Sequence, residues 1–186
     1  LIEKTFHKSP KFIFEVIPRF VDRLKKMFPS SSVEHLAVSN TISKKVEIKG
    51  AKSWEHQINT GASMIVRGDE YKYTLTTVNT TTIDLYFGLK KKEINFLKID
   101  TEGMDGRVLR GARRMLRGKR IQCIFWENNK MQNLVGDSLY KNIQFLNSLG
   151  YVSFQVGHDK LYPISDCVKN HAVFLPNAPT GNILSI

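Results

Sequence analysis

The spacing of apolar and polar positions predicts short strands and amphipathic helices that alternate along the chain. Phe96 to Ile99 form an apolar run typical of a buried strand, and apolar positions then recur at helical spacing from Met104 to Gly118. The stretch NFLKIDTEG, residues 95–103, joins the two and carries Asp100 and Glu102. These acids therefore lie at a strand-to-helix corner, which is where open α/β sheets bind their ligands.

The same pattern predicts further elements on both sides of this corner. Pro18 suits the first position of a helix because its φ angle is fixed. The expected elements are a strand over 11–17, a helix over 18–28, strands over 33–39, 46–50 and 121–125, a helix over 138–149, and strands over 151–156 and 171–175. No helical pattern joins the last two strands, so we expect an antiparallel end to an otherwise parallel sheet. Alternating strands and helices indicate an α/β fold.

Residues 51–82 give a weaker pattern. Within them, 62–66 (ASMIV) and 71–78 (YKYTLTTV) have the composition of strands, and the turn-like RGDE lies between them. We expect an insertion there. No repeat, low-complexity segment or linker marks off a second unit, so the sequence predicts one domain over residues 1–186.

Composition and charge narrow the possible partners only slightly. No apolar run approaches the ~18 residues that span a bilayer, so we expect no membrane span. The net charge of +11 would attract nucleic acid, an anionic membrane or an acidic glycan. The opening LIEKTFHKSP lacks the succession of basic, apolar and small residues that defines a signal peptide, and we expect that the sequence was cut from a longer chain. The cellular compartment is not predicted, and the cytoplasm is the default.

Metal and nucleophile chemistry find little support in the sequence. Cys123 lies in a strand-like run and Cys167 in a polar loop, which gives neither a disulfide framework nor a metal-binding spacing. The five histidines show no paired ligand spacing, so we expect no metal site. Ser39 lacks the glycine-flanked turn of a hydrolase nucleophile.

Three charged residues around the corner allow two interpretations. Side chains alternate sides on a strand, so Lys98 and Asp100 share one side, and Glu102 joins them if the backbone stays extended. In the first interpretation, the three groups form a functional cluster at the open sheet edge. In the second, Lys98 and Asp100 form a structural ion pair, and Glu102 favours the start of the next helix through the helix dipole.

Two further acids end predicted strands. Glu15, in FIFEVI, could accept hydrogen bonds from both hydroxyls of a ribose, or could simply face outward on an edge strand. Glu127 closes FWE and could face the same crevice, or could serve as an ordinary cap or ion-pair partner.

Basic residues cover one face of the predicted helix after Gly103. A solvated surface is the simplest explanation, and a phosphate-rich partner is the alternative. No aromatic side chains interleave with them as a base-stacking platform would require. These residues are Arg107, Arg110, Arg113, Arg114 and Arg117, followed by Lys119 and Arg120.

The corner motif resembles the signature of the FkbM family of S-adenosylmethionine-dependent methyltransferases. FLKIDTEG matches a KID-x-EG corner, and Val108 to Ala112 (VLRGA) matches the VL-x-GA of the helix behind it. Further segments are similar to family elements in the same order: FIFEVIPRF, HLAVSN, TTIDLYF, IFWE and NHAVFLP.

Two departures from the family pattern stand out. The family begins with a D-x-GAN-x-G strand and loop that holds the methionine end of the cofactor, and the sequence contains no such segment. The sequence is therefore expected to be either a fragment, N-terminally truncated, or a degenerate member of the family. In both cases we expect a domain that lacks the first strand and binds cofactor poorly. The second departure is Val16-Ile17-Pro18, where the family usually has proline directly after the acid.

The resemblance implies a class I methyltransferase (Rossmann-like) sandwich, with a mostly parallel seven-stranded sheet, an antiparallel C-terminal strand and helices on both faces. It implies S-adenosyl-L-methionine as cofactor and O-methylation of a hydroxyl, on a carbohydrate or another small natural product. A non-catalytic binding module and an RNA methyltransferase are the alternatives. The oligomeric state is not predicted.

The resemblance also assigns roles to the candidate site residues. Asp100 is expected nearest the sulfonium or the acceptor hydroxyl, with Glu102 and Lys98 in orientation and proton handling. The catalytic residues are expected to be Lys98, Asp100, Glu102 and Glu127. The cofactor-binding residues are expected to be Glu15 at the ribose, Ala37 and Val38 at the edge of the adenine, and in addition Val16 and Asp100.

Overall fold

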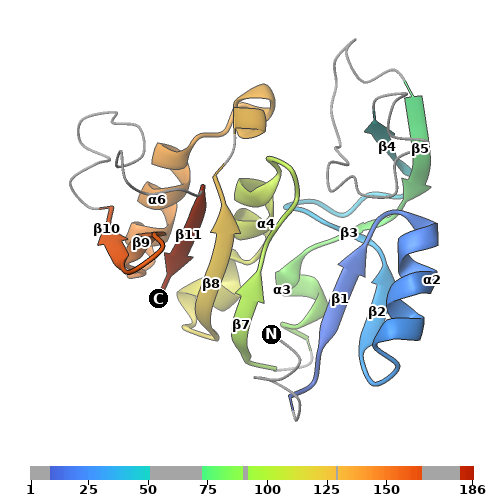
Figure 1. Cartoon of the computed structure of the whole chain (residues 1–186), viewed down its shortest axis with the longest axis horizontal. Coiled ribbons are helices and arrows are strands. Elements are labelled where there is room, and N and C mark those ends of the chain that lie inside the picture. The colour runs from blue at the N-terminus through green and yellow to red at the C-terminus, as the bar shows by residue number, and fades with distance from the viewer. Residues whose placement is uncertain (1–8, 51–72, 90–91, 129, 165–180) are drawn as a thin grey trace.

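A computed structural model describes residues 9–50, 73–89, 92–128, 130–164 and 181–186, and shows an α/β fold (Figure 1). Its largest sheet has the strand order β10-β9-β11-β8-β7. The only parallel ladder of this sheet joins β7 to β8, and β11 runs antiparallel to both β8 and β9. The strands are β7 (Ile94–Lys98), β8 (Ile121–Glu127), β9 (Ser153–Val156), β10 (Leu161–Pro163) and β11 (Asn182–Ser185).

The remaining described strands pair two by two, and the helices lie between the strands in the chain. The parallel pairs are β1 (Phe12–Glu15) with β2 (Ser32–His35) and β3 (Ala37–Val38) with β6 (Thr80–Thr81); the antiparallel pair is β4 (Val46–Gly50) with β5 (Tyr73–Val78). The helices are α2 (Pro18–Met27), α3 (Ile83–Tyr86), α4 (Asp105–Gly111), α5 (Arg113–Arg117) and α6 (Leu139–Ser148), with the 3₁₀ helix η2 (Lys130–Val135).

The α/β class and the antiparallel end are confirmed, but the expectation of a mostly parallel sheet is wrong for the five described strands. The reason is the position of β11. It inserts between β8 and β9, so both strands pair with an antiparallel neighbour, and β10 also runs antiparallel to β9. The antiparallel strand is Asn182–Ser185, whereas the predicted strand 171–175 lies outside the described residues.

In the described part of the chain, aromatic contacts, and not a hydrogen-bonded ladder, connect β1 to the elements around the five-stranded sheet. Among the described residues β1 pairs only with β2, and α3 lies behind the space between β1 and β7 (Figure 1). The ring of Phe12 lies 5.1 Å from that of Phe87, and the ring of Phe14 lies 4.9 Å from that of Tyr86, both edge to face.

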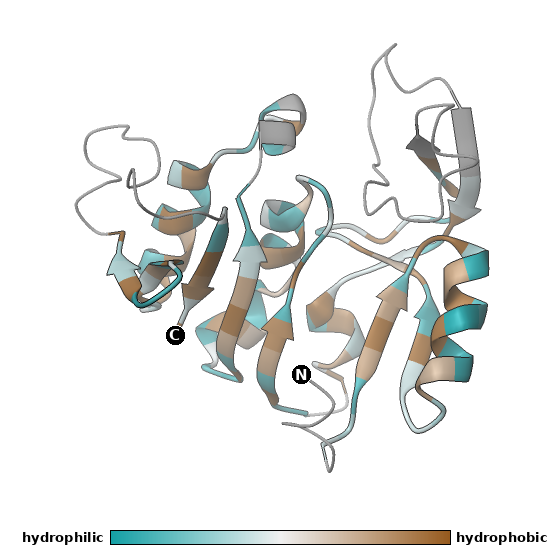
Figure 2. Cartoon of the chain, viewed as in Figure 1, coloured by the Kyte–Doolittle hydropathy of each residue, from teal (hydrophilic) through white to brown (hydrophobic). Residues whose placement is uncertain are grey.

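Two apolar clusters form the core. The larger one packs the central strands of the sheet against α4, α5 and α6, with Leu109, Ile124 and Trp126 fully buried. The smaller one joins Ile17 and Ala37 to the β4–β5 pair. Figure 2 shows apolar residues concentrated on the strands and polar residues on the outer side of α2, as the amphipathic pattern predicted.

Two predicted elements are divided in the structure. The strand expected over 33–39 is split into β2 and β3, because β2 pairs with β1 whereas β3 pairs with β6. The helix expected over 104–118 is interrupted at Ala112, and α5 begins anew behind it. The Asp84 carboxylate starts this second helix, since it accepts hydrogen bonds from the backbone N–H groups of Arg114 and Met115, each at 2.9 Å.

The glycine of the VLRGA motif lies against the end of β3. A Cβ atom on Gly111 would come within 2.0 Å of the Ser39 carbonyl oxygen. We expect Gly111→Ala to destabilise the fold by about 1 to 3 kcal/mol, because the two backbones must separate to admit a methyl group. Urea unfolding measures this loss. Gly118→Ala is the control, with the nearest atom, the Arg114 carbonyl oxygen, at 3.3 Å; equal losses from both variants would contradict the close approach.

Candidate functional site

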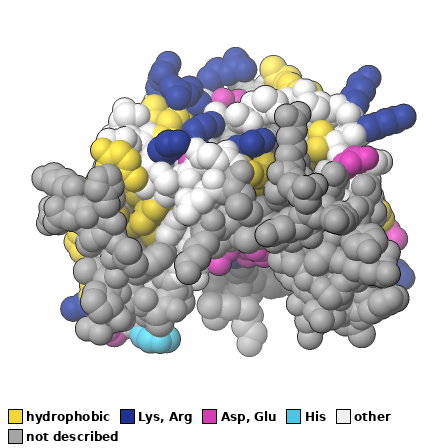
Figure 3. Space-filling view, turned by 90° about the horizontal axis from the view of Figure 1, so that it is seen from above, with side chains coloured by type: hydrophobic (Ala, Val, Ile, Leu, Met, Phe, Trp, Pro, Cys, Tyr) yellow, Lys and Arg dark blue, Asp and Glu magenta, His cyan; other side chains and the backbone are white. Residues whose placement is uncertain are grey.

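The corner between β7 and α4 carries the candidate site. Ile99 is buried, and its N–H donates to the carbonyl of Phe125, which keeps the chain beside β8 just past the end of β7. The next residues leave the sheet, and the N–H of Met104 closes a turn onto the carbonyl of Thr101. A group of acidic side chains lies near the centre of the molecule when it is viewed from above (Figure 3).

Glu102 and Gly103 take unusual backbone conformations in this turn. Their φ angles are +51° and +93°, which lie in the left-handed region. Glycine adopts this region freely, whereas a glutamate there is strained. The extended geometry that would align Glu102 with Lys98 and Asp100 therefore does not continue past the strand. Strained residues of this kind cluster at functional sites.

The environment of Glu102 shifts its acid–base behaviour. Burial is the main cause that raises the pKa of Glu102 from its usual 4.5 to about 7. Neighbouring negative charges raise it further, in the order Glu127, Asp100 and Asp105. At neutral pH this carboxyl is therefore divided between its protonated and ionised forms.

Asp105 fastens the corner to the end of the neighbouring strand. Its side chain is buried, and Oδ2 accepts hydrogen bonds from the N–H of Thr101 at 3.2 Å and from the Thr101 hydroxyl at 2.6 Å. Oδ1 accepts from the N–H of Glu127 at 3.0 Å. Burial raises the pKa of Asp105, and the hydrogen bonds act in the opposite direction. One carboxylate thus holds the ends of β7 and β8 together.

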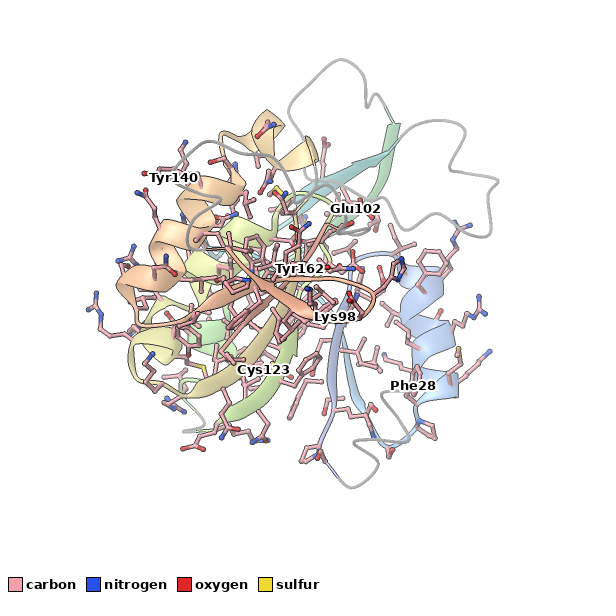
Figure 4. The ribbon with its side chains drawn as sticks, turned by 60° about the vertical axis from the view of Figure 1, so that its left-hand side comes forward. Phe28, Lys98, Glu102, Cys123, Tyr140 and Tyr162 are labelled. Carbon is pink, nitrogen blue, oxygen red and sulfur yellow. The ribbon has the colours of Figure 1, made fainter. Side chains whose placement is uncertain are left out.

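Lys98 and Asp100 form the predicted ion pair, but it is not buried. Lys98 Nζ lies 2.5 Å from Asp100 Oδ2, and the two side chains are 45% and 51% exposed. Figure 4 shows Lys98 and Glu102 in the same part of the molecule, with Cys123 further down the sheet. A pair this exposed contributes at most about 1 kcal/mol to stability. The ion pair of the second interpretation is therefore present, at a position where the charges of both groups face solvent.

The structure brings four carboxyl groups to the ends of two strands. Asp100, Glu102 and Asp105 follow β7, and Glu127 ends β8, where its charge is the strongest electrostatic influence on Glu102. In the described ranges, no three His, Cys, Asp or Glu side chains are placed to hold a metal ion. The cluster can exchange protons near neutral pH and can attract a cation.

The residues expected at the cofactor lie at the ends of β1 and β3. Glu15 Oε1 accepts hydrogen bonds from the N–H groups of Val16 and Ile17, at 2.7 and 2.8 Å. Val16 and Ala37 pack in the smaller apolar cluster, and Ala37 is only 4% exposed. Val38 is half-buried against the larger cluster.

The basic helix face is only partly a solvated surface. The guanidinium of Arg110 makes a two-pronged interaction with Asp137, with nitrogen–oxygen distances of 3.0 and 3.2 Å, and also donates to Asn142. Arg113 lies over the ring of Phe145, 4.9 Å from its centroid. In contrast, the Arg114 side chain is 87% exposed. The solvated interpretation is therefore wrong for Arg110.

Two acids with clear structural roles were missed by the sequence pattern. Asp105 lies between Met104 and Gly106 at the start of the predicted helix, and Asp84 lies inside TTIDLYF. The available signal for Asp105 was an acid in the first turn of a helix, four residues after Thr101. Nothing in the local sequence of Asp84 could indicate that it begins α5, because its partners are 30 and 31 residues away.

A family model described as the methyltransferase FkbM domain matches residues 10–153, which include β1 and the whole corner. The protein is thus an S-adenosylmethionine-dependent methyltransferase. It belongs to the FkbM family, as the KIDTEG and VLRGA motifs predicted. No match was found among curated proteins or among solved structures. None of the described helices combines the length and the apolar character needed to cross a membrane.

Proposed function

We propose that this methyltransferase acts on a hydroxyl group of a carbohydrate or another small natural product. The observation that supports the proposal is the carboxyl of Glu102, with its pKa of about 7, at the open end of the sheet. A hydroxyl oxygen that gains a methyl group must lose its proton. A carboxylate whose pKa lies near the working pH is well suited to accept it.

In this proposal the acidic residues of the corner have different roles in the reaction. Glu102 takes the acceptor's proton while the new carbon–oxygen bond forms. Asp100, paired with Lys98, supplies negative charge next to the reacting groups and orients the acceptor. Glu127 keeps the proton affinity of Glu102 high through its charge. Asp105 fixes where the two strand ends lie, and its charge is the weakest of the three that raise the pKa of Glu102.

The cofactor assignment rests on the chemistry of Glu15. S-adenosylmethionine supplies, when bound, a methyl group on a positively charged sulfur. Its ribose offers two hydroxyl donors, and a carboxylate at the end of a strand fits them. The Glu15 carboxylate is already oriented by two backbone N–H groups, both of which use Oε1. Oε2 is therefore the oxygen that we assign to the ribose, with Ala37 and Val38 beside the adenine and Val16 next to the Glu15 carboxylate.

A carbohydrate acceptor is favoured over RNA. Arg110 and Arg113, in the middle of the basic face, contact Asp137 and Phe145, so that face is not wholly available to phosphates. A screen of glycans, small natural products and RNA with the intact protein and cofactor carrying a labelled methyl group tests the choice. Label that enters only RNA would overturn it. No transfer to any acceptor, together with no binding of S-adenosylhomocysteine, would favour a non-catalytic binding module.

The role of Glu15 gives a separate prediction. Glu15→Gln keeps the size of the side chain but removes its charge, so we expect S-adenosylhomocysteine to bind the intact protein more weakly by about 1 to 3 kcal/mol. Isothermal titration calorimetry measures the affinity. Asp22→Asn, on the exposed side of α2, is the matched control and should bind as the wild type does. Unchanged affinity in a folded Glu15→Gln protein would remove Glu15 from the cofactor site.

A further inference from the structure

A hollow of 220 Å³ opens between α3 and α5, away from the acid cluster. Its walls include Leu85, Leu89, Arg114 and Arg120. Arg120 directly precedes β8, and its carbonyl accepts from the N–H of Ile94 at the start of β7. The hollow therefore lies near the amino ends of these strands, whereas the candidate site lies at their carboxyl ends. The proposed methyl transfer makes no use of it.

Two leucines project beside this hollow. Leu85 is 37% exposed and Leu89 is 79% exposed, which makes Leu89 the most exposed of the large apolar side chains in the described part of the chain. The N–H of Leu85 donates to the side-chain oxygen of Thr82 at 3.0 Å. Phe87, which lies between the two leucines in the sequence, is buried. The backbone that presents both leucines is thus anchored. Grouped apolar side chains rimmed by charged residues mark interaction surfaces.

Cations surround the two leucines. Arg114 is 87% exposed, and Arg117 follows it three residues later on the same side of α5. Arg120 is held in place because its Nη2 donates to the carbonyl of Lys92 at 2.5 Å. The one acid in the wall, Asp84, is only 11% exposed and accepts from two backbone N–H groups.

We propose that this face docks on an anionic phospholipid bilayer. Leu85 and Leu89 enter the boundary between headgroups and acyl chains, and the hollow accepts a lipid phosphate beside Arg114 and Arg120. Exposed leucines among cations fit a surface that is anionic outside and apolar beneath, since apolar insertion and charge attraction add together there. Nucleic acid is a poorer occupant, because leucines add nothing to phosphate binding and the hollow's wall contains no aromatic ring for a base to stack on.

Vesicle co-sedimentation of the intact protein tests the proposal. We expect binding to vesicles of phosphatidylcholine that also contain anionic phosphatidylserine, and little binding to vesicles of phosphatidylcholine alone. The double variant Leu85→Ser/Leu89→Ser should bind at least tenfold more weakly. Arg114→Ser/Arg117→Ser should lose about fivefold per arginine, and this loss should shrink at high salt.

Matched controls locate the binding on this face. Val152→Ser/Leu161→Ser changes two other exposed apolar residues, and Lys25→Ser/Lys26→Ser changes two exposed cations of α2; both should bind as the wild type does. Absence of binding to anionic vesicles overturns the proposal. So does binding that the leucine variant retains in full, which would show charge attraction alone. Capture of a soluble acidic peptide, lost in the Leu85→Ser/Leu89→Ser variant while vesicles stay unbound, would assign the face to a protein partner instead.

Discussion

Replacing Glu102 by glutamine lowers the rate of methyl transfer by roughly 100- to 10,000-fold, the usual effect of losing a group that accepts a proton in the reaction. The wild-type rate rises with pH through about 7, because only the ionised carboxylate can take the acceptor's proton, and is constant above this range. Single-turnover methylation across pH measures both effects. Glu127→Gln should move the rise to lower pH, since it removes the strongest neighbouring charge.

Stability gives a second readout for the same variant. The pKa of Glu102 is higher in the folded chain, about 7, than its usual 4.5. The folded chain therefore keeps a proton that the unfolded chain has released, and this group's contribution to stability falls as pH rises from about 4.5 to 7. Glutamine has no charge to bury. At pH 8 we expect Glu102→Gln to be more stable than wild type by about 1 to 2 kcal/mol, reduced for partial solvent exposure, and equal to it near pH 4.

Glu93→Gln serves as the control for Glu102→Gln, because Glu93 is exposed just before β7 begins. It should change neither the rate nor the pH dependence of stability. A Glu102→Gln enzyme that keeps wild-type turnover and its rise through pH 7 would exclude Glu102 as the proton acceptor. A variant that is inactive because it is unfolded would show no cooperative unfolding transition in its melting curve.

Replacing Asp105 by alanine destabilises the protein by about 2 to 5 kcal/mol. The change leaves the buried N–H of Glu127 and the N–H and hydroxyl of Thr101 without their acceptor, and each unmade bond costs about 1 to 3 kcal/mol. Asp105→Asn should cost less. Its one remaining oxygen can still accept, and the neutral side chain avoids the cost of burying a charge. Urea unfolding measures both variants.

Asp22→Ala, on the exposed side of α2, should change the free energy of unfolding by less than about 0.5 kcal/mol and is the control. If Asp105→Ala were as stable as this control, Asp105 would not be the fastening between β7 and β8. In the folded fraction of Asp105→Asn, the rise in rate should move slightly to lower pH. The reason is that Asp105 contributes the weakest of the three negative charges that raise the pKa of Glu102.

Local patterns predicted most of the elements near the site. β7, β8, α2 and α6 occur within a few residues of their predicted bounds, because each depends on apolar periodicity and on local signals such as Pro18. The parts that were wrong depend on distant partners. The predicted helix 104–118 is interrupted at Ala112, where α5 begins with its N–H groups bonded to Asp84. The predicted strand 33–39 is divided because β3 pairs with β6, whose residues lie more than 40 positions away. No window along the sequence contains both partners.

The candidate site was predicted in composition but not in geometry. The corner motif identified Asp100 and Glu102, but alternation could align Glu102 with Lys98 and Asp100 only if the backbone stayed extended, and the φ of Glu102 is +51°. The Lys98–Asp100 pair was predicted correctly, but its exposure depends on where the sheet edge meets solvent. The role of Asp105 was not predicted, because an acid at the start of a helix does not indicate which backbone groups of other elements it will contact.

If the enzyme docks through Leu85 and Leu89, the length of β7 sets the distance between the docking face and the candidate site. β7 has five residues, and at about 3.3 Å per residue it separates the two ends of the sheet by roughly 17 Å. The proton acceptor would then stand above the lipid headgroups and face the water. Hydroxyls of the bilayer itself would be out of reach, and the methyl acceptor would have to arrive from solution or extend from the membrane on a chain of several sugars.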